Sequence, residues 1–338
     1  MQERYIEAFG RHLARRYISR QKIGCYYRTD FYTARQFIIF DMVVLIGCAG
    51  WSYEDWVERF YPIQLAGKRS EWLGYYARFF PTVEINSTFY RVPTADIVKA
   101  WIEKGSKLEK FEFSVKMHKE VTHETLIAGK PEKAAEQAAS FENICLGPLA
   151  DANLLGAVLI QLSPEFTMEL PGAIDRLRTL FSLLETDRHK YAVEFRHKSW
   201  VNEAGTDLKS DILDLLREFK VAHVIVDGPA FPITRSLTAN HAYIRFHGRN
   251  YDIWFREESE DDYRLNRYDY LYTEDQLIRW KPRIEELASN ASEVRVYFNN
   301  HGRAKAVKNA LYMMDLLGIP HEEKEVYIQD QMKLGDYY

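Results

Sequence analysis

The chain has 338 residues, 46% of them hydrophobic, and its 45 Lys and Arg against 49 Asp and Glu give a formal charge of −4. This composition predicts a globular protein with a sizeable core and excludes a general attraction to nucleic acid or acidic membranes. The longest apolar stretch, residues 37–50, is interrupted by Asp41 and is shorter than the roughly 20 residues that cross a bilayer, so we expect no membrane contact.

The three cysteines and the first 41 residues carry further information. The cysteines are odd in number and widely spaced, which argues against a disulfide scaffold and favours a reducing cytoplasm.

Residues 1–36 hold eight basic and three acidic residues, unlike the acidic remainder. We therefore interpret 1–41 as an N-terminal extension, either a non-native start or a flexible arm, followed by one domain over 42–320 and a C-terminal tail over 321–338.

From Met42 onward, short β-rich runs alternate with longer stretches of helical apolar spacing. Strands are predicted at 43–48, 82–86, 111–116, 155–161, 190–195, 221–226, 241–246 and 293–298. Helices are predicted at 68–79, 94–105, 131–145, 169–184, 206–219, 274–289 and 303–317, and the connection 228–240 looks non-helical because it contains Pro229 and Pro232. Eight strands alternating with helices predict an α/β fold, a single-domain (β/α)8 TIM barrel.

The alternation within the strands predicts which side chains face the barrel interior. Val193 and Phe195 alternate with Glu194 and Arg196, and strands two, three, seven and eight repeat this pattern. The apolar set is expected to face the helices, so the sequence predicts a polar lumen. For Glu112 and Arg295, a buried ion pair that fixes the barrel is as good an interpretation as a functional role.

TIM-barrel active sites lie at the C-terminal ends of the strands. The polar residues that the sequence places there are Glu84, Asn86, Lys116, His118, Gln161, Glu194, Arg196, Asp227, Arg245, His247, Asn299 and His301. Cations cluster among them although the chain is acidic, which favours an anionic substrate, because Arg binds phosphate or carboxylate with two parallel hydrogen bonds. The rim aromatics Trp51 and Tyr53 are candidates for stacking on a sugar or a base.

Six separated motifs occur in one order along the chain: GWSYEDW (50–56), TVEINSTFYRVP (82–93), FSVKMHKEVTH (113–123), AVEFRHKSW (192–200), AYIRFHG (242–248) and VYFNNHGRAKAVKNA (296–310). Together they resemble the YecE-like family, domain of unknown function number seventy-two. The resemblance implies a TIM barrel and leaves the reaction open. Related-looking barrels bind divalent metals through inward carboxylates and histidines, and by that analogy Glu194, Asp227 and His247 are metal-ligand candidates.

The leading hypothesis is an enzyme for metal-assisted hydrolysis of a phosphoester. In this hypothesis Glu84, Glu194, Asp227 and His247 are catalytic, and the other strand-end residues with Trp51 and Tyr53 bind the substrate. An anionic small molecule or a short, single-stranded nucleic acid fits the overall acidity better than a duplex does.

Two alternatives stay open. One is a metal-independent carbohydrate-active enzyme with Glu84 and Glu194 as the acid and base pair. The other is a non-catalytic module that binds an anionic ligand or a protein through the long loop 248–273.

Overall fold

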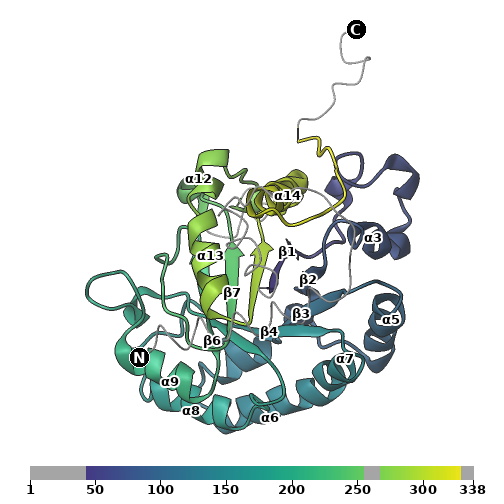
Figure 1. Cartoon of the computed structure of the whole chain (residues 1–338). Helices are drawn as coiled ribbons and strands as arrows, with labels where there is room; N and C mark the ends of the chain where they lie inside the picture. Colours follow the sequence, from purple (N-terminus) through teal and green to yellow (C-terminus); the bar gives the residue numbers. More distant parts are fainter. Residues whose placement is uncertain (1–42, 255–266, 329–338) are drawn as a thin grey trace, which may run out of the picture. The chain divides into compact units, whose positions relative to one another are not determined.

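The strands form a closed parallel barrel in the order of the sequence (Figure 1). The computed structural model describes residues 43–254 and 267–328. The strands are β1 (Val43–Ala49), β2 (Thr82–Ile85), β3 (Glu112–Lys116), β4 (Leu155–Gln161), β5 (Tyr191–Glu194), β6 (Ala222–Asp227), β7 (His241–Phe246) and β8 (Glu293–Phe298). The predicted (β/α)8 TIM barrel is confirmed, while the expectation for residues 1–41 concerns residues outside the described ranges.

Neighbouring strands pair over unequal lengths. β1 and β8 close the barrel through six register pairs, from Val43 opposite Glu293 to Cys48 opposite Phe298. β5 and β6 share only two, Ala192 opposite Ala222 and Val193 opposite His223. The ring is therefore held least extensively where β5 meets β6.

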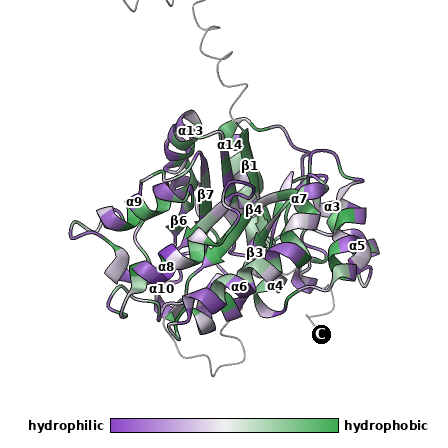
Figure 2. Cartoon of the chain, turned by 90° about the horizontal axis from the view of Figure 1, so that it is seen from below, coloured by the Kyte–Doolittle hydropathy of each residue, from purple (hydrophilic) through white to green (hydrophobic). Residues whose placement is uncertain are grey.

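Helices surround the strands, and hydrophilic residues lie along these outer elements (Figures 1 and 2). The α-helices are α3 (Arg69–Tyr76), α4 (Ser87–Tyr90), α5 (Ala95–Gly105), α6 (Pro131–Phe141), α7 (Gly147–Asp151), α8 (Ala173–Ser182), α9 (Ser210–Glu218), α10 (Tyr251–Trp254), α12 (Glu274–Ile278), α13 (Lys281–Asn290) and α14 (Lys305–Leu317). No described helix has both the length and the apolar character that a membrane span requires.

Two of the predicted helices are interrupted. The helix predicted at 131–145 ends at Phe141 and continues as one π-helical turn over Glu142–Leu146. The helix predicted at 274–289 is two helices, because α12 ends at Ile278 and α13 begins at Lys281 with a proline in its first turn. The connection 228–240 contains no helix, as predicted.

The alternation of the strands is confirmed. One buried cluster contains the apolar residues that pack under the helices, including Val83, Val193 and Ile244. A second, separate cluster fills part of the lumen with Ala157, Leu159, Ala192, Ala222, Val224, Val226, Tyr243 and Tyr297. The expectation of a polar lumen is therefore wrong for β4, β5 and β6. On these strands the inward positions that precede Gln161, Glu194 and Asp227 are apolar.

The first part of the predicted tail packs on the barrel. Arg78 forms an ion pair with Glu322, with 2.7 Å between their nearest nitrogen and oxygen atoms. The backbone nitrogen of Tyr327 donates to the carbonyl of Arg59 at 3.1 Å, and Val326 is buried. Residues 321–328 thus contact the barrel directly.

Candidate active site

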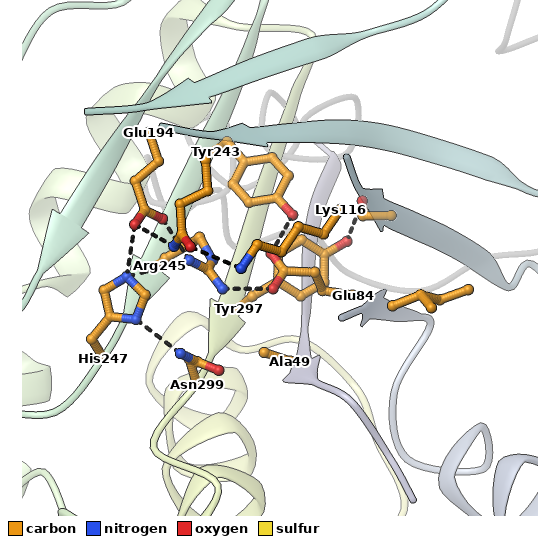
Figure 3. A network of polar contacts seen from close by, with 12 residues as sticks. Ala49, Glu84, Lys116, Glu194, Tyr243, Arg245, His247, Tyr297 and Asn299 are labelled. Atoms are coloured by element: carbon orange, nitrogen blue, oxygen red, sulfur yellow. Dashed lines mark hydrogen bonds and ion pairs between the residues drawn. The ribbon is translucent and has the colours of Figure 1, made fainter. Parts of the chain in front are cut away.

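Arg245 on β7 is the centre of a buried network at the C-terminal side of the barrel (Figure 3). Its guanidinium donates to Glu84 of β2 at 2.8 Å and to Glu194 of β5 at 2.5 Å, and all three side chains are at most 2% exposed. The hydroxyl of Tyr243 donates to the second oxygen of Glu84 at 2.6 Å. Burial alone would raise the pKa of Glu194, but Arg245 holds it well below its usual value. Glu194 is therefore an ionised carboxylate at neutral pH.

Lys116 on β3 reaches this network through an amide. Its Nζ donates to Gln161 Oε1 at 2.8 Å, and Gln161 Nε2 donates to Glu194 Oε1 at 2.7 Å. The amine also lies 3.9 Å from the centroid of the Phe89 ring. Burial, with the charge of Arg245 as the next cause, lowers the pKa of Lys116 to about 7. The amine is therefore poised between its two protonation states at neutral pH.

His247 is held in one orientation from both sides of its ring. Its Nε2 lies 3.3 Å from Glu194 Oε1, and its Nδ1 lies 3.0 Å from Asn299 Nδ2. The Asn299 amide donates from Nδ2 to Nδ1, while Nε2 faces both Glu194 Oε1 and, at 3.3 Å, an Arg245 nitrogen that can only donate. Burial lowers the pKa of His247, so the imidazole is neutral. The pair is a carboxylate and a neutral imidazole in hydrogen-bond contact.

Arg196 follows β5 and is half-buried. Within 43–254 and 267–328 it has no ion pair and no hydrogen bond. Its charge contributes to lowering the pKa of Lys116 and of His247. In the described parts of the chain, neither Arg196 nor the amine of Lys116 thus has a carboxylate partner.

A row of rings lies beside the network. The ring of His301 lies between two tyrosines. Its centroid is 4.5 Å from that of Tyr53 and 5.3 Å from that of Tyr268. Tyr268 in turn contacts Trp254 at 5.7 Å, and Trp254 lies 6.0 Å from His247. Burial lowers the pKa of His301 to about 4. The flanks of the loop 248–273 therefore reach the site, while its middle lies outside the described residues.

Asp227 lies apart from this network. Its carboxylate accepts from Arg249 at 2.7 Å, from the Tyr272 hydroxyl at 3.0 Å and from Trp280 Nε1 at 2.7 Å. Ala222, Val224 and Val226 occupy the lumen positions of β6, so Asp227 points to the outside of the barrel. The structure thus does not bring Asp227 together with Glu194 and His247.

The proposed metal ligands do not fit a divalent cation. No group of three His, Cys, Asp or Glu residues suited to a metal occurs in the described parts of the chain. Glu194 already accepts from Arg245 and Gln161, and a guanidinium beside the carboxylate repels a dication. These residues are therefore not a site for a divalent metal.

The remaining predicted site residues have local roles. Asn86 is the N-cap residue of α4, and its carbonyl accepts from the backbone of Phe89 at 3.1 Å. His118 Nδ1 accepts from the backbone nitrogen of Glu120 at 3.3 Å. Trp51 packs on Phe113, which belongs to the outer core, at 6.4 Å between centroids. None of these side chains has a contact with Arg245 or Lys116 among the interactions of the described residues.

Glu112 and Arg295 form the ion pair that the sequence left open. Arg295 donates twice to Glu112, at 2.7 and 2.8 Å, and also pairs with Glu293 at 2.5 Å. Both residues occur early in their strands, so the pair lies toward the N-terminal side of the barrel, away from the strand ends. Its role is structural.

Two members of the site were not singled out by the sequence. Tyr243 lies two residues before Arg245, and the inward parity of β7 places it in the lumen with Arg245. His123 follows β3; burial lowers its pKa to about 4, with Lys116 the next cause. Tyr243 was detectable by parity, whereas His123 lies in a π-helical turn that no periodicity signals.

The fold and this network define a class: a TIM barrel with a buried, charged site built from the C-terminal ends of its strands. The family model described as "Protein of unknown function DUF72" matches residues 45–332. The chain therefore belongs to the DUF72 family, which confirms the resemblance found in the sequence.

Several proteins of known sequence or structure are similar to the chain. The UPF0759 protein YunF of Bacillus subtilis is 27% identical over 291 residues, covering 82% of this chain and 96% of YunF. YecE of Escherichia coli K12 is 24% identical, covering 69% and 87%. The crystal structure of a DUF72 protein from Thermotoga maritima matches with a TM-score of 0.68 and 31% identity, covering 82% of this chain and 99% of that one. An Enterococcus faecalis DUF72 structure, at 23% identity and a TM-score of 0.66, shows the same fold.

Proposed function

We propose that the protein is an enzyme that binds the phosphate group of a small substrate at Arg196 and Lys116 and transfers a proton through the Glu194–His247 pair. The observation that carries this proposal is that the cation Arg196 and the buried amine of Lys116 both lack a carboxylate partner among the described residues. A cation of this kind at the mouth of a barrel is stabilised when an anion binds between it and its neighbour. The substrate's charge would thus complete the site.

The proton-transfer step rests on His247. In the tautomer with the proton on Nε2, His247 donates to Glu194 and Nδ1 is the proton acceptor. Asn299 occupies Nδ1 with its amide in the free protein. A substrate hydroxyl or a water molecule that takes the place of the amide is in position to lose its proton to Nδ1.

The structure gives less support to the carbohydrate alternative. A glycosidase needs one carboxylic acid that stays protonated near neutral pH. Glu84 and Glu194 instead share one guanidinium, and the pKa of Glu194 lies well below its usual value. We therefore prefer the phosphate-bearing substrate.

The first test is the binding of inorganic pyrophosphate by calorimetry in the presence of a chelator. We expect Arg196→Gln to weaken binding about tenfold or more, which corresponds to one lost charge-assisted contact. The matched control is Arg217→Gln on α9, where the arginine is exposed and pairs with Asp214. Equal binding by wild type, Arg196→Gln and Arg217→Gln would contradict the proposal.

The second test is activity. A panel of phosphate esters that includes short single-stranded oligonucleotides is assayed for release of phosphate or alcohol in the presence of a chelator. His247→Asn should lower any activity found about 10²- to 10⁴-fold while pyrophosphate binding persists. If His247→Asn instead abolishes pyrophosphate binding and leaves the turnover of bound substrate unchanged, His247 binds the substrate and does not transfer the proton.

A further inference from the structure

The amine of Lys116 is buried without the counter-ion that a buried lysine normally has. The side chain is 8% exposed, and its amine contacts the Gln161 amide and the face of Phe89. The two acidic groups that raise the pKa of Lys116, Glu194 and Glu84, are both ion-paired with Arg245. Because Arg245 neutralises Glu84 and Glu194, these carboxylates do little to stabilise the ammonium form of Lys116.

This surrounding favours the neutral amine. Burial penalises the ammonium form, and the neighbouring cations Arg245 and Arg196 penalise it further. A lysine that is desolvated or placed beside another cation is a nucleophile at neutral pH, because a substantial share of it has a free electron pair. Gln161 Oε1 accepts one N–H and so orients the amine.

We propose that Lys116 is a nucleophilic amine that forms an imine with the carbonyl group of a small anionic aldehyde or ketone. The inference rests on the proposed function, since Arg196 binds the anionic group and thereby selects the substrate. It adds the chemical class of the substrate, which is a carbonyl compound that carries a phosphate or a carboxylate.

The step is balanced without an oxidant or a reductant. The electron pair of the neutral amine attacks the carbonyl carbon, a C–N bond forms, and the carbonyl oxygen takes up a proton. The carbinolamine then loses that oxygen as water, which breaks the C–O bond and leaves a protonated imine. Overall, one neutral lysine amine, one carbonyl group and one proton taken up from solvent give one iminium ion and one water molecule.

The test is reductive trapping of the full-length protein. Wild type is incubated at pH 7 with sodium cyanoborohydride and one of three probes: pyruvate, dihydroxyacetone phosphate or acetone. Modified peptides are then identified by mass spectrometry. We expect an adduct on Lys116 at least tenfold above that on any other lysine with one of the two anionic probes, and little adduct with neutral acetone.

Two variants control the experiment. Lys116→Arg should lose the adduct while retaining the circular dichroism spectrum and melting curve of the wild type. Lys119→Arg, at an exposed lysine that pairs with Glu124, should keep the adduct on Lys116. The position of the adduct in wild type is itself decisive, so the test stands even if Lys116→Arg does not fold.

The outcomes separate this inference from the proposed function. Adducts spread evenly over exposed lysines with every probe would overturn the role of Lys116 but leave pyrophosphate binding intact. An adduct on Lys116 that forms equally well with acetone would support the reactive amine and contradict selection of the anion by Arg196. Preference for dihydroxyacetone phosphate or for pyruvate identifies phosphate or carboxylate as the anionic group.

Discussion

Oε1 of Glu84 lies 2.8 Å from a guanidinium nitrogen of Arg245, and both side chains are almost completely buried. The same guanidinium binds Glu194, so one cation neutralises two interior carboxylates from β2 and β5. Replacement of Arg245 leaves both carboxylates uncompensated. We predict that Arg245→Ala lowers the free energy of unfolding by about 3–5 kcal/mol, measured by denaturant titration at pH 7.

The control for this prediction is Arg178→Ala on α8. Arg178 pairs with Glu218 at 2.6 Å, but both side chains are about half exposed. Exposed ion pairs contribute about 0–1 kcal/mol, so this variant should unfold nearly as the wild type does. A similar loss of stability in both variants would show that the buried pairing is not special.

Asp227 is expected to stabilise the two ends of the loop 248–273 rather than to take part in catalysis. Its carboxylate joins Arg249 to Tyr272 and Trp280. We predict that Asp227→Asn lowers the free energy of unfolding by about 1–3 kcal/mol, because a charge-assisted hydrogen bond is lost. Trp280 fluorescence monitors the change, and pyrophosphate binding should stay within a factor of a few of wild type. A selective loss of binding at unchanged stability would return Asp227 to the site.

Two buried histidines predict how stability depends on pH. Burial lowers the pKa of His223 to about 4 and that of His241 to about 3. The unfolded chain protonates these residues near pH 6.5, so it binds more protons than the folded chain below that pH. Stability should therefore fall as the pH drops from about 6.5 toward 4, by up to about 1.4 kcal/mol per pH unit for each histidine.

The variant His223→Gln tests this sign. Its unfolding free energy, measured at pH 7.5 and pH 4.5, should fall less between the two pH values than that of the wild type. The control Thr234→Val removes only the hydrogen-bond partner of His223 Nε2, which lies at 2.6 Å. It should cost a similar amount at both pH values. Identical pH dependence in wild type and His223→Gln would contradict the assignment.

Gly47 and Gly74 predict opposite effects of the same substitution. A Cβ atom on Gly47 of β1 would lie 2.1 Å from the carbonyl oxygen of Thr82 on the neighbouring strand. Gly47→Ala should therefore lower the free energy of unfolding by about 3 kcal/mol. Gly74 in α3 has nothing within 4 Å of that position, and Gly74→Ala should raise stability by about 0.5–1 kcal/mol. Thermal unfolding of both variants is the measurement, and effects of the same sign would refute this explanation.

The sequence predicted most of the barrel because β2, β3, β7 and β8 each have one polar and one apolar face. The bounds of β4, β7 and β8 match the prediction, and parity placed Glu84, Lys116, Glu194 and Arg245 inside. The helix breaks at 142 and 279 were missed because apolar spacing continues across them. Pro282 was an available signal for the second break, since proline is favoured in the first turn of a helix.

The orientation of Asp227 was not predictable by the same means. β6 carries Ala, Val and Val on one face and His, Ile and Asp on the other, so apolar residues occur on both and the contrast between them is weak. The pairing of side chains was also beyond the sequence. Parity shows that Glu84 and Glu194 face inward, but only the three-dimensional arrangement shows that one Arg245 binds both.

The two register pairs between β5 and β6 have a consequence for the motion of the barrel. A closed ring that opens locally does so where the fewest backbone hydrogen bonds must break. Deuterium should thus enter the amides of β5 and β6 sooner than those of β1 and β8, which share six pairs. Glu194 is the last residue of β5. Local separation of β5 from β6 would therefore displace one side of the buried network and let a ligand enter.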